Sequence, residues 1–140
     1  MQEGHNRAIN RHQWDYQELT KRLSNPLHSQ AIVFEKLMAL LAIRTTQSAF
    51  HPNATQFTLH LGDTIFGFWR QSQDRQQSIF CISNISKFPY QLPLASVNLI
   101  AMDHWYELIS NQAISLATET LSLAPYQTVW ITNQRPTASK

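Results

Sequence analysis

The spacing of apolar residues changes near Ala49 and divides the chain into a helical part and a part rich in strands. Between Ser29 and Gln47, apolar residues recur at helical spacing and predict one long helix. They cover far more than the third of the circumference that a surface helix buries, so this helix is expected to have neighbours on several sides. The apolar residues concerned are Ile32, Val33, Phe34, Leu37, Met38, Leu40, Leu41 and Ile43.

A shorter helix is predicted before the long one. Asp15 can cap a helix that runs through Leu23, and Glu18 stands three residues later, as a capping box requires. Asn25 and Pro26 follow and predict where this helix stops.

After Ala49, short runs rich in Ile, Phe, Val, Thr and Trp alternate with turn residues, a pattern typical of β-strands. Strands are predicted at 55–61, 64–71, 77–84, 90–94, 96–102, 114–118, 119–123 and 127–132. Residues 104–110 are expected to form an irregular excursion that shields a sheet edge, because Trp105, Leu108 and Ile109 have helical spacing but Asn111 follows closely. The order predicts an α+β fold, with N-terminal helices followed by an antiparallel β-sandwich or Greek-key arrangement.

Composition narrows the function classes. The 140 residues are enough for one domain with a core, and 43% hydrophobic against 14% charged residues exclude a disordered chain and a coiled coil. The net charge of +2 comes without a basic run, so no nucleic acid partner is expected. No apolar stretch reaches the eighteen residues of a membrane span, and the single cysteine with a polar N-terminus favours a cytoplasmic location.

The search for catalytic chemistry finds no convincing site. The acidic residues show no paired arrangement, and Asp63 and Asp74 have ready explanations as turn residues. Six histidines lack metal-ligand spacing, and there is no glycine-rich phosphate loop, so neither a metal nor a cofactor is expected. Cys81 lies in an apolar run and is expected to be a buried hydrophobe. Trp105 and Tyr106 are the aromatic pair that can be interpreted as a platform for stacking on sugar rings.

The N-terminal block Arg7-Ala8-Ile9-Asn10-Arg11-His12 stands out because arginine in irregular backbone is suited to fork-shaped hydrogen bonding with oxygen-rich ligands. A solvated tail explains the same residues. Together with Leu40-Leu41-Ala42-Ile43-Arg44, Ala49-Phe50-His51-Pro52 and the closing segment from Leu121 to Trp130, this block resembles the C-terminal part of sucrose phosphorylase-like enzymes in the α-amylase family (glycoside hydrolase family 13). The resemblance spans nearly the whole chain in the same order.

The resemblance implies that residues 1–48 are the end of a (β/α)₈ barrel including its last helix, that residues 49–133 are an antiparallel β domain, and that residues 134–140 are a disordered tail. It places the family's catalytic carboxylates upstream of this sequence, so the chain alone is expected not to be an enzyme. The remainder of the barrel would be its partner. Arg7 matches the family arginine that hydrogen-bonds the donor glucosyl ring.

Two other functions remain open. One is a carbohydrate-binding module that uses Trp105 and Tyr106. The other is a self-associating interaction domain that forms a homodimer through the exposed face of the long helix.

Overall fold

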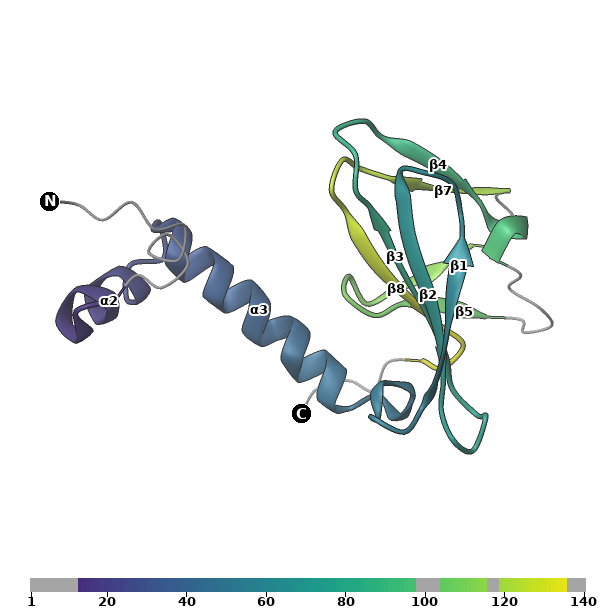
Figure 1. Cartoon of the computed structure of the whole chain (residues 1–140), viewed down its shortest axis with the longest axis horizontal. Helices are drawn as coiled ribbons and strands as arrows, with labels where there is room; N and C mark the ends of the chain where they lie inside the picture. Colours follow the sequence, from purple (N-terminus) through teal and green to yellow (C-terminus); the bar gives the residue numbers. More distant parts are fainter. Residues whose placement is uncertain (1–12, 98–103, 116–118, 136–140) are drawn as a thin grey trace, which may run out of the picture. The chain divides into compact units, whose positions relative to one another are not determined.

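The computed structural model describes residues 13–97, 104–115 and 119–135 (Figure 1). The chain divides into two compact units, Met1–Leu41 and Ala42–Lys140. Each unit is described by itself. Residues 98–103, which contain most of one predicted strand, and residues 116–118, the end of another, lie outside the described residues.

The first unit begins with helix α2 (Tyr16–Leu23). As predicted, Asp15 is its N-cap, and the Asp15 Oδ1 atom accepts the backbone N–H of Glu18 at 3.0 Å. The Glu18 carboxylate does not complete a capping box, because it forms an ion pair with Arg22 one turn later. The helix ends at the C-cap Ser24, before Pro26.

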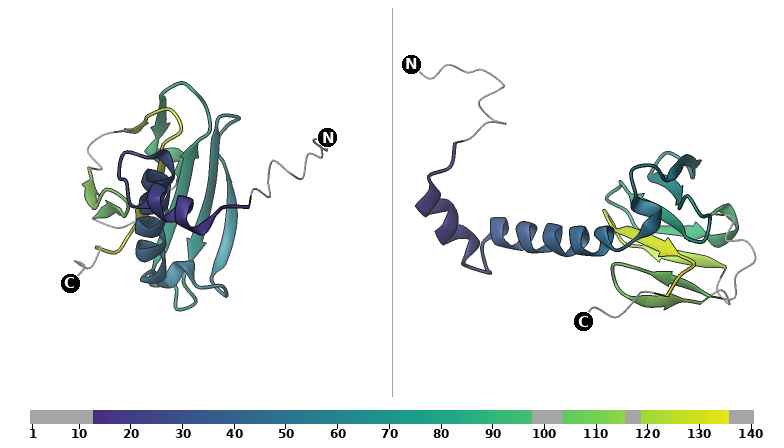
Figure 2. Two further views of the ribbon diagram at one scale, coloured as in Figure 1. Left: turned by 90° about the vertical axis from the view of Figure 1, so that its left-hand side faces the viewer. Right: turned by 90° about the horizontal axis from the view of Figure 1, so that it is seen from below.

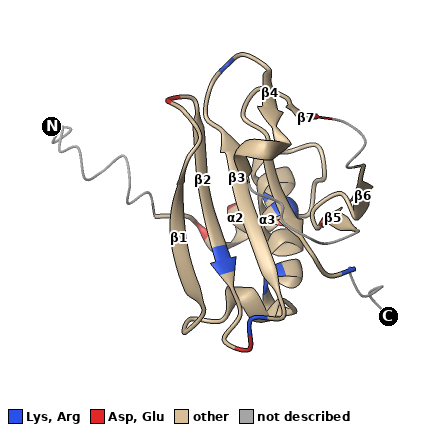
Figure 3. Cartoon of the chain, turned by 90° about the vertical axis from the view of Figure 1, so that its right-hand side faces the viewer, with Lys and Arg blue, Asp and Glu red and all other residues tan. Residues whose placement is uncertain are grey.

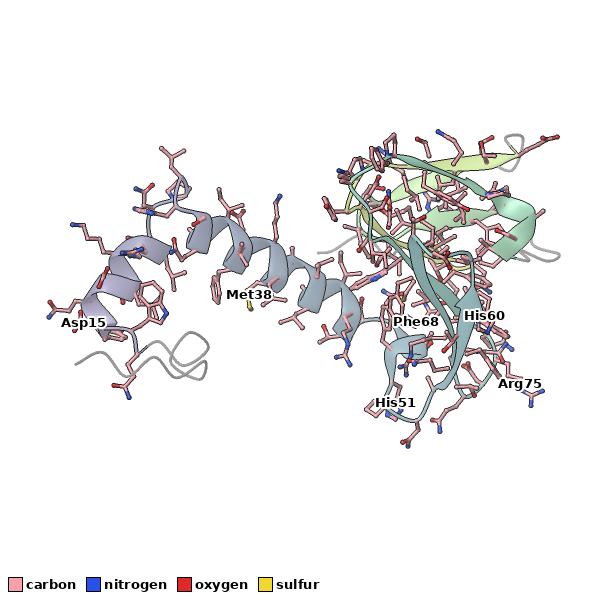
Figure 4. All side chains as sticks on the ribbon, turned by 45° about the horizontal axis from the view of Figure 1, so that its top comes forward. Asp15, Met38, His51, His60, Phe68 and Arg75 are labelled. Carbon is pink, nitrogen blue, oxygen red and sulfur yellow. The ribbon has the colours of Figure 1, made fainter. Side chains whose placement is uncertain are left out.

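Helix α3 (Ser29–Thr45) begins at the predicted residue and ends two residues earlier than expected. Among its residues, only Ala31 is buried. Large apolar side chains along the helix are 40–65% exposed, and Figure 4 shows one of them, Met38, projecting from the ribbon. The exposed side chains are Ile32, Val33, Phe34, Leu37, Met38 and Leu41. The helix therefore leaves uncovered the apolar surface that the sequence predicts.

The second unit is an antiparallel sandwich of two sheets. The larger sheet contains, in spatial order, β1 (Thr55–His60), β2 (Ile65–Gln71), β3 (Ser78–Asn84), β8 (Thr128–Thr132), β5 (Trp105–Glu107) and β6 (Gln112–Ile114). The smaller sheet pairs β4 (Tyr90–Pro93) with β7 (Thr120–Leu123). The last strand, β8, inserts in the middle of the larger sheet, beside β3, as Figure 2 shows. This arrangement confirms the predicted α+β class.

Three local predictions differ from the structure. The segment predicted as an irregular excursion contains β5, which pairs with β8 and forms a hairpin with β6. The helical spacing was misleading because Trp105 and Leu108 are buried in different apolar clusters, on opposite sides of the sheet. In addition, the predicted strand at 96–102 begins within a 3₁₀ turn, η2 (Leu94–Val97), and the strand predicted at 114–118 corresponds to β6, which ends at Ile114.

Two apolar clusters hold the second unit together. The inner core lies between the two sheets and includes Ile82 and Ile131 from the larger sheet with Leu92 and Leu123 from the smaller one. All four side chains are fully buried. The outer cluster lies on the other face of the larger sheet, where a short 3₁₀ turn, η1 (Ser48–Phe50), packs against it. The described strands carry few charged residues, as their tan colour in Figure 3 shows.

Candidate functional site

The aromatic pair Trp105 and Tyr106 does not form a common surface. Trp105 is only 3% exposed, and its ring contacts Phe80 edge to face with 5.6 Å between centroids. Tyr106 is the next residue of β5, so its side chain leaves the strand on the opposite face. Stacking of a sugar on both rings stays a prediction, and it would require Trp105 to leave the core.

The other predicted site residue, Arg7, lies outside the described residues. Its contact with a glucosyl ring therefore stays an implication of the family resemblance.

Several carboxylates of the described residues have structural roles. Glu107 is 8% exposed, and its side chain accepts three backbone N–H groups, from Ile109 at 3.0 Å, from Trp130 at 2.8 Å and from Ser110. These bonds close the β5–β6 turn and tie it to β8. The Glu107 carboxylate is therefore buried and hydrogen-bonded on both oxygens.

Asp74 and Cys81 confirm two interpretations made from the sequence. Asp74 lies in the β2–β3 turn, where hydrogen bonds from the Ser72 hydroxyl and the Gln76 N–H lower the pKa of its carboxyl. Cys81 is 3% exposed, and burial raises the pKa of its thiol to about 12. A thiol with such a pKa is protonated at neutral pH and is a poor nucleophile.

Metal-binding groups were also searched for. Within residues 13–97, 104–115 and 119–135, no three His, Cys, Asp or Glu side chains come together in a way that would hold a metal ion. None of the helices in this part of the chain is long and apolar enough to cross a membrane.

The most developed polar arrangement lies where the end of α3 joins the sandwich, and we call it the junction (Gln47, Ser48, Ala49, Arg70 and Gln77). Gln77 is its centre and is only 2% exposed. Its side-chain oxygen accepts the Ser48 hydroxyl at 3.0 Å and the Ala49 N–H at 2.9 Å, while its amide donates to Gln47 Oε1 at 2.6 Å. One buried amide thus holds three consecutive residues of the segment that follows α3.

Arg70 fastens the same segment from the neighbouring strand. Its Nε donates to the Ala49 carbonyl at 2.8 Å and its Nη2 to the His51 carbonyl at 2.8 Å, while Nη1 reaches Gln56 Oε1 at 3.1 Å. The guanidinium suits this task because it presents several donors in one rigid plane. Between these polar contacts, the Phe50 ring packs edge to face on Trp130 with centroids 4.9 Å apart.

The Ser48 hydroxyl of the junction donates to the amide oxygen of Gln77 and not to a basic group, so the arrangement is suited to positioning the segment that follows α3. The sequence analysis missed Gln77 and Arg70. Arg70 lies within β2 and Gln77 directly precedes β3, each as an ordinary polar residue of the sequence, and only the pairing of β2 with β3 brings both under η1.

The sequence is similar to characterised phosphorylases. It is 30% identical to glucosylglycerate phosphorylase of Spirochaeta thermophila over 140 residues, covering 94% of this chain and 24% of that enzyme. It is 26% identical to glucosylglycerate phosphorylase of Escherichia coli over 129 residues, covering 91% of this chain and 21% of that enzyme. The chain spans about a quarter of the length of these curated relatives.

Both matches lie at the C-terminal ends of the relatives. The chain is therefore similar to the C-terminal region of sucrose phosphorylase-like enzymes of the α-amylase family, which confirms the resemblance predicted from the sequence. No family model matches the chain.

The fold comparison agrees. The structure of AmyP in complex with maltose superposes with a TM-score of 0.60 and 16% sequence identity, covering 79% of this chain and 22% of that one. At this identity the likeness concerns the fold alone. It confirms the predicted antiparallel C-terminal domain of the amylase type.

Proposed function

We propose that this chain acts as the non-catalytic C-terminal part of a sucrose phosphorylase-like enzyme that transfers an α-glucosyl unit, and that it stabilises the catalytic barrel through α3. The observation that carries the proposal is the apolar surface of α3, whose large side chains are 40–65% exposed. A helix that is apolar on most sides is normally buried in a larger body. The relatives contain such a larger body, since the chain matches only about a quarter of their length and the rest lies outside the matched region.

The expected contribution of this contact is large compared with the stability of a typical protein. Burying a few hundred Å² of apolar surface at about 25 cal/mol per Å² contributes on the order of several kcal/mol. Typical domains are stable by only about 5–15 kcal/mol, so loss of α3 or of its cover would matter to the whole enzyme.

The catalytic steps themselves are assigned to the preceding body. Retaining glucosyl transfer uses two carboxyl groups about 5 Å apart, one as nucleophile and one as acid and base. In the described residues, Glu107 is occupied by backbone N–H groups, Glu18 by Arg22 and Asp74 by its own turn. Arg7 is proposed to reach the rim of the glucosyl site, and the whole enzyme is proposed to be cytoplasmic.

The test combines this chain with the body of a relative. The Spirochaeta thermophila enzyme is truncated before its matched region and assayed for phosphorolysis of glucosylglycerate, alone and with this chain supplied separately. We expect no turnover by this chain alone, and a higher thermal midpoint and activity of the body when the chain is present. Turnover by the purified chain alone would overturn the proposal. So would a truncated enzyme whose thermal midpoint and activity do not change when the chain is added.

The exposed apolar side chains of α3 also support a second candidate function, in which two copies of the chain pair through this helix. Sedimentation of the chain with Leu37→Glu against the unmodified chain distinguishes the two. Self-association would be favoured if the unmodified chain is a dimer, Leu37→Glu dissociates it, and the chain does not change the stability or activity of the truncated enzyme. Leu37 is 50% exposed, so the substitution is not expected to unfold the chain.

A further inference from the structure

The larger sheet is apolar on the face that points away from the smaller sheet. The outward face of a sandwich usually carries polar side chains. Here, the strand register places Phe68 of β2, Cys81 of β3 and Trp130 of β8 in one row across that outer face. Such an apolar row is expected to be buried under another part of the protein.

The chain supplies this cover over one end of the face. Ala49 and Phe50 of η1, with Ile43 from the last turn of α3, pack in the outer cluster. Gln77 and Arg70 hold this covering segment by the hydrogen bonds of the junction. Within the second unit, the segment 43–50 therefore packs on the outer face of the sandwich.

The other end of the face is uncovered around Phe66. The Phe66 ring centroid lies 5.8 Å from that of Phe68, so Phe66 extends the apolar surface along β2 beyond this row, yet it is 54% exposed. In the strand register, Phe66 is paired with Ser83 of β3, and Ser83 is paired with Thr128 of β8. Both residues are polar and uncharged, and their hydroxyls form a hydrogen bond of 2.8 Å with each other. On the other side, His60 pairs with Phe66. A weakly polar surface with one protruding ring fits a neutral protein surface better than a charged ligand.

We propose that the outer face around Phe66 is the surface of the sandwich that packs against the body preceding this region in the longer relatives. The inference rests on the proposed function and adds the face of contact. Three observations support it: the segment 43–50 packs on this face, the Phe66 ring contacts Phe68 of the outer cluster, and the relatives have about three quarters of their length outside the matched region.

The test measures protection of a thiol, with Phe88 as a matched control. Phe66 and Phe88 are both phenylalanines, 54% and 64% exposed, and Phe88 lies in the loop between β3 and β4. The native Cys81 is 3% exposed, and the high pKa of its thiol keeps background labelling low. Phe66→Cys and Phe88→Cys are made in the chain alone and in a chimera, in which this chain replaces the matched region of the Spirochaeta thermophila enzyme.

Both introduced thiols are expected to react at similar rates in the chain alone. In the chimera, labelling should slow at least about tenfold for Phe66→Cys and less than about twofold for Phe88→Cys, because a covered thiolate cannot reach the reagent. Equal reactivity of both variants in the chimera, or protection of Phe88→Cys instead, would overturn the assignment of the face.

A cleavable linker placed before residue 1 of this chain separates this failure from failure of the proposed function. If the cleaved chain leaves the body on gel filtration, the proposed function fails, and the face assignment fails with it. If it stays bound and Phe66→Cys remains reactive, only the face assignment fails. Phe66→Ser against Phe88→Ser gives a second readout, since only the former is expected to weaken co-elution of the chain with a separately expressed body.

Discussion

Helix α3 and the sandwich contain similar apolar side chains in opposite environments. In the sandwich, Ile82, Leu92 and Leu123 are fully buried between two sheets. Along α3, Val33, Phe34 and Leu37 are at least half exposed. The difference indicates that the sandwich completes its own core, whereas the helix leaves much of its apolar surface exposed, which we propose a neighbour covers. Apolar composition alone does not distinguish these two cases.

The largest expected effect separates the two regions directly. Ile82→Ala removes fully buried methyl groups from the inner core and should lower the free energy of unfolding by about 2–4 kcal/mol. Leu37→Ala in α3 should change it by less than about 0.5 kcal/mol, because the side chain is half exposed. Urea unfolding of both variants measures this contrast. Equal losses would show that α3 is covered within the chain in solution.

The junction should give the next largest effect. Gln77→Ala leaves the buried Ala49 N–H without its acceptor and should cost about 1–3 kcal/mol. Gln91→Ala is the matched control, because the Gln91 amide makes its hydrogen bond to Ser122 at the exposed surface. The control should cost less than about 0.5 kcal/mol in the same urea measurement. A Gln77→Ala variant as stable as the control would mean that the junction does not hold the segment after α3.

A smaller loss is expected for Glu107→Gln. The amide retains the shape but has one oxygen in place of two, so it cannot accept all three N–H groups, and about 1–2 kcal/mol should be lost. Glu35→Gln on the exposed surface of α3 serves as the control and should be close to neutral. Chemical denaturation at neutral pH compares them, and equal stability of the two variants would contradict the structural role of Glu107.

The smallest effect concerns pH. The hydrogen bond from Ser72, followed by that from Gln76, lowers the folded-state pKa of Asp74 below the ordinary aspartate value of 3.8. A carboxyl with a depressed pKa stabilises the fold above its unfolded pKa, and this stabilisation is lost as the pH falls through the folded pKa. Asp74→Asn should therefore reduce the fall in stability below about pH 4. NMR titration of Asp74 should give a pKa below 3.8, and a higher value would contradict this account.

Local chemistry was sufficient for much of the fold prediction. Asp15 caps α2 because a short carboxylate can accept an N–H three residues later, and α3 begins where the apolar spacing begins. The strands that alternate strongly, from Thr55 to Asn84 and near the C-terminus, were predicted within one or two residues. Trp105 was misassigned because three residues of strand are too short for their alternation to be distinguished from a helical turn.

The candidate site was less predictable. Nothing in the sequence near Gln77 indicates that its amide is buried under residues about thirty positions earlier. The roles of Arg70 and Glu107 likewise depend on contacts between strands and loops that are distant in the chain. Such hydrogen bonds are set by register, which local patterns do not specify.

The sequence by itself determined the two regions of this protein, the apolar character of the long helix and the similarity to the C-terminal end of sucrose phosphorylase-like enzymes, because periodicity, capping residues and motifs act over short spans of chain. Only the tertiary structure decided which apolar side chains are covered. Burial depends on what lies opposite a side chain in space, and the sandwich provides an opposite sheet for Ile82 and Leu123 while Phe34, Leu37 and Phe66 stay exposed.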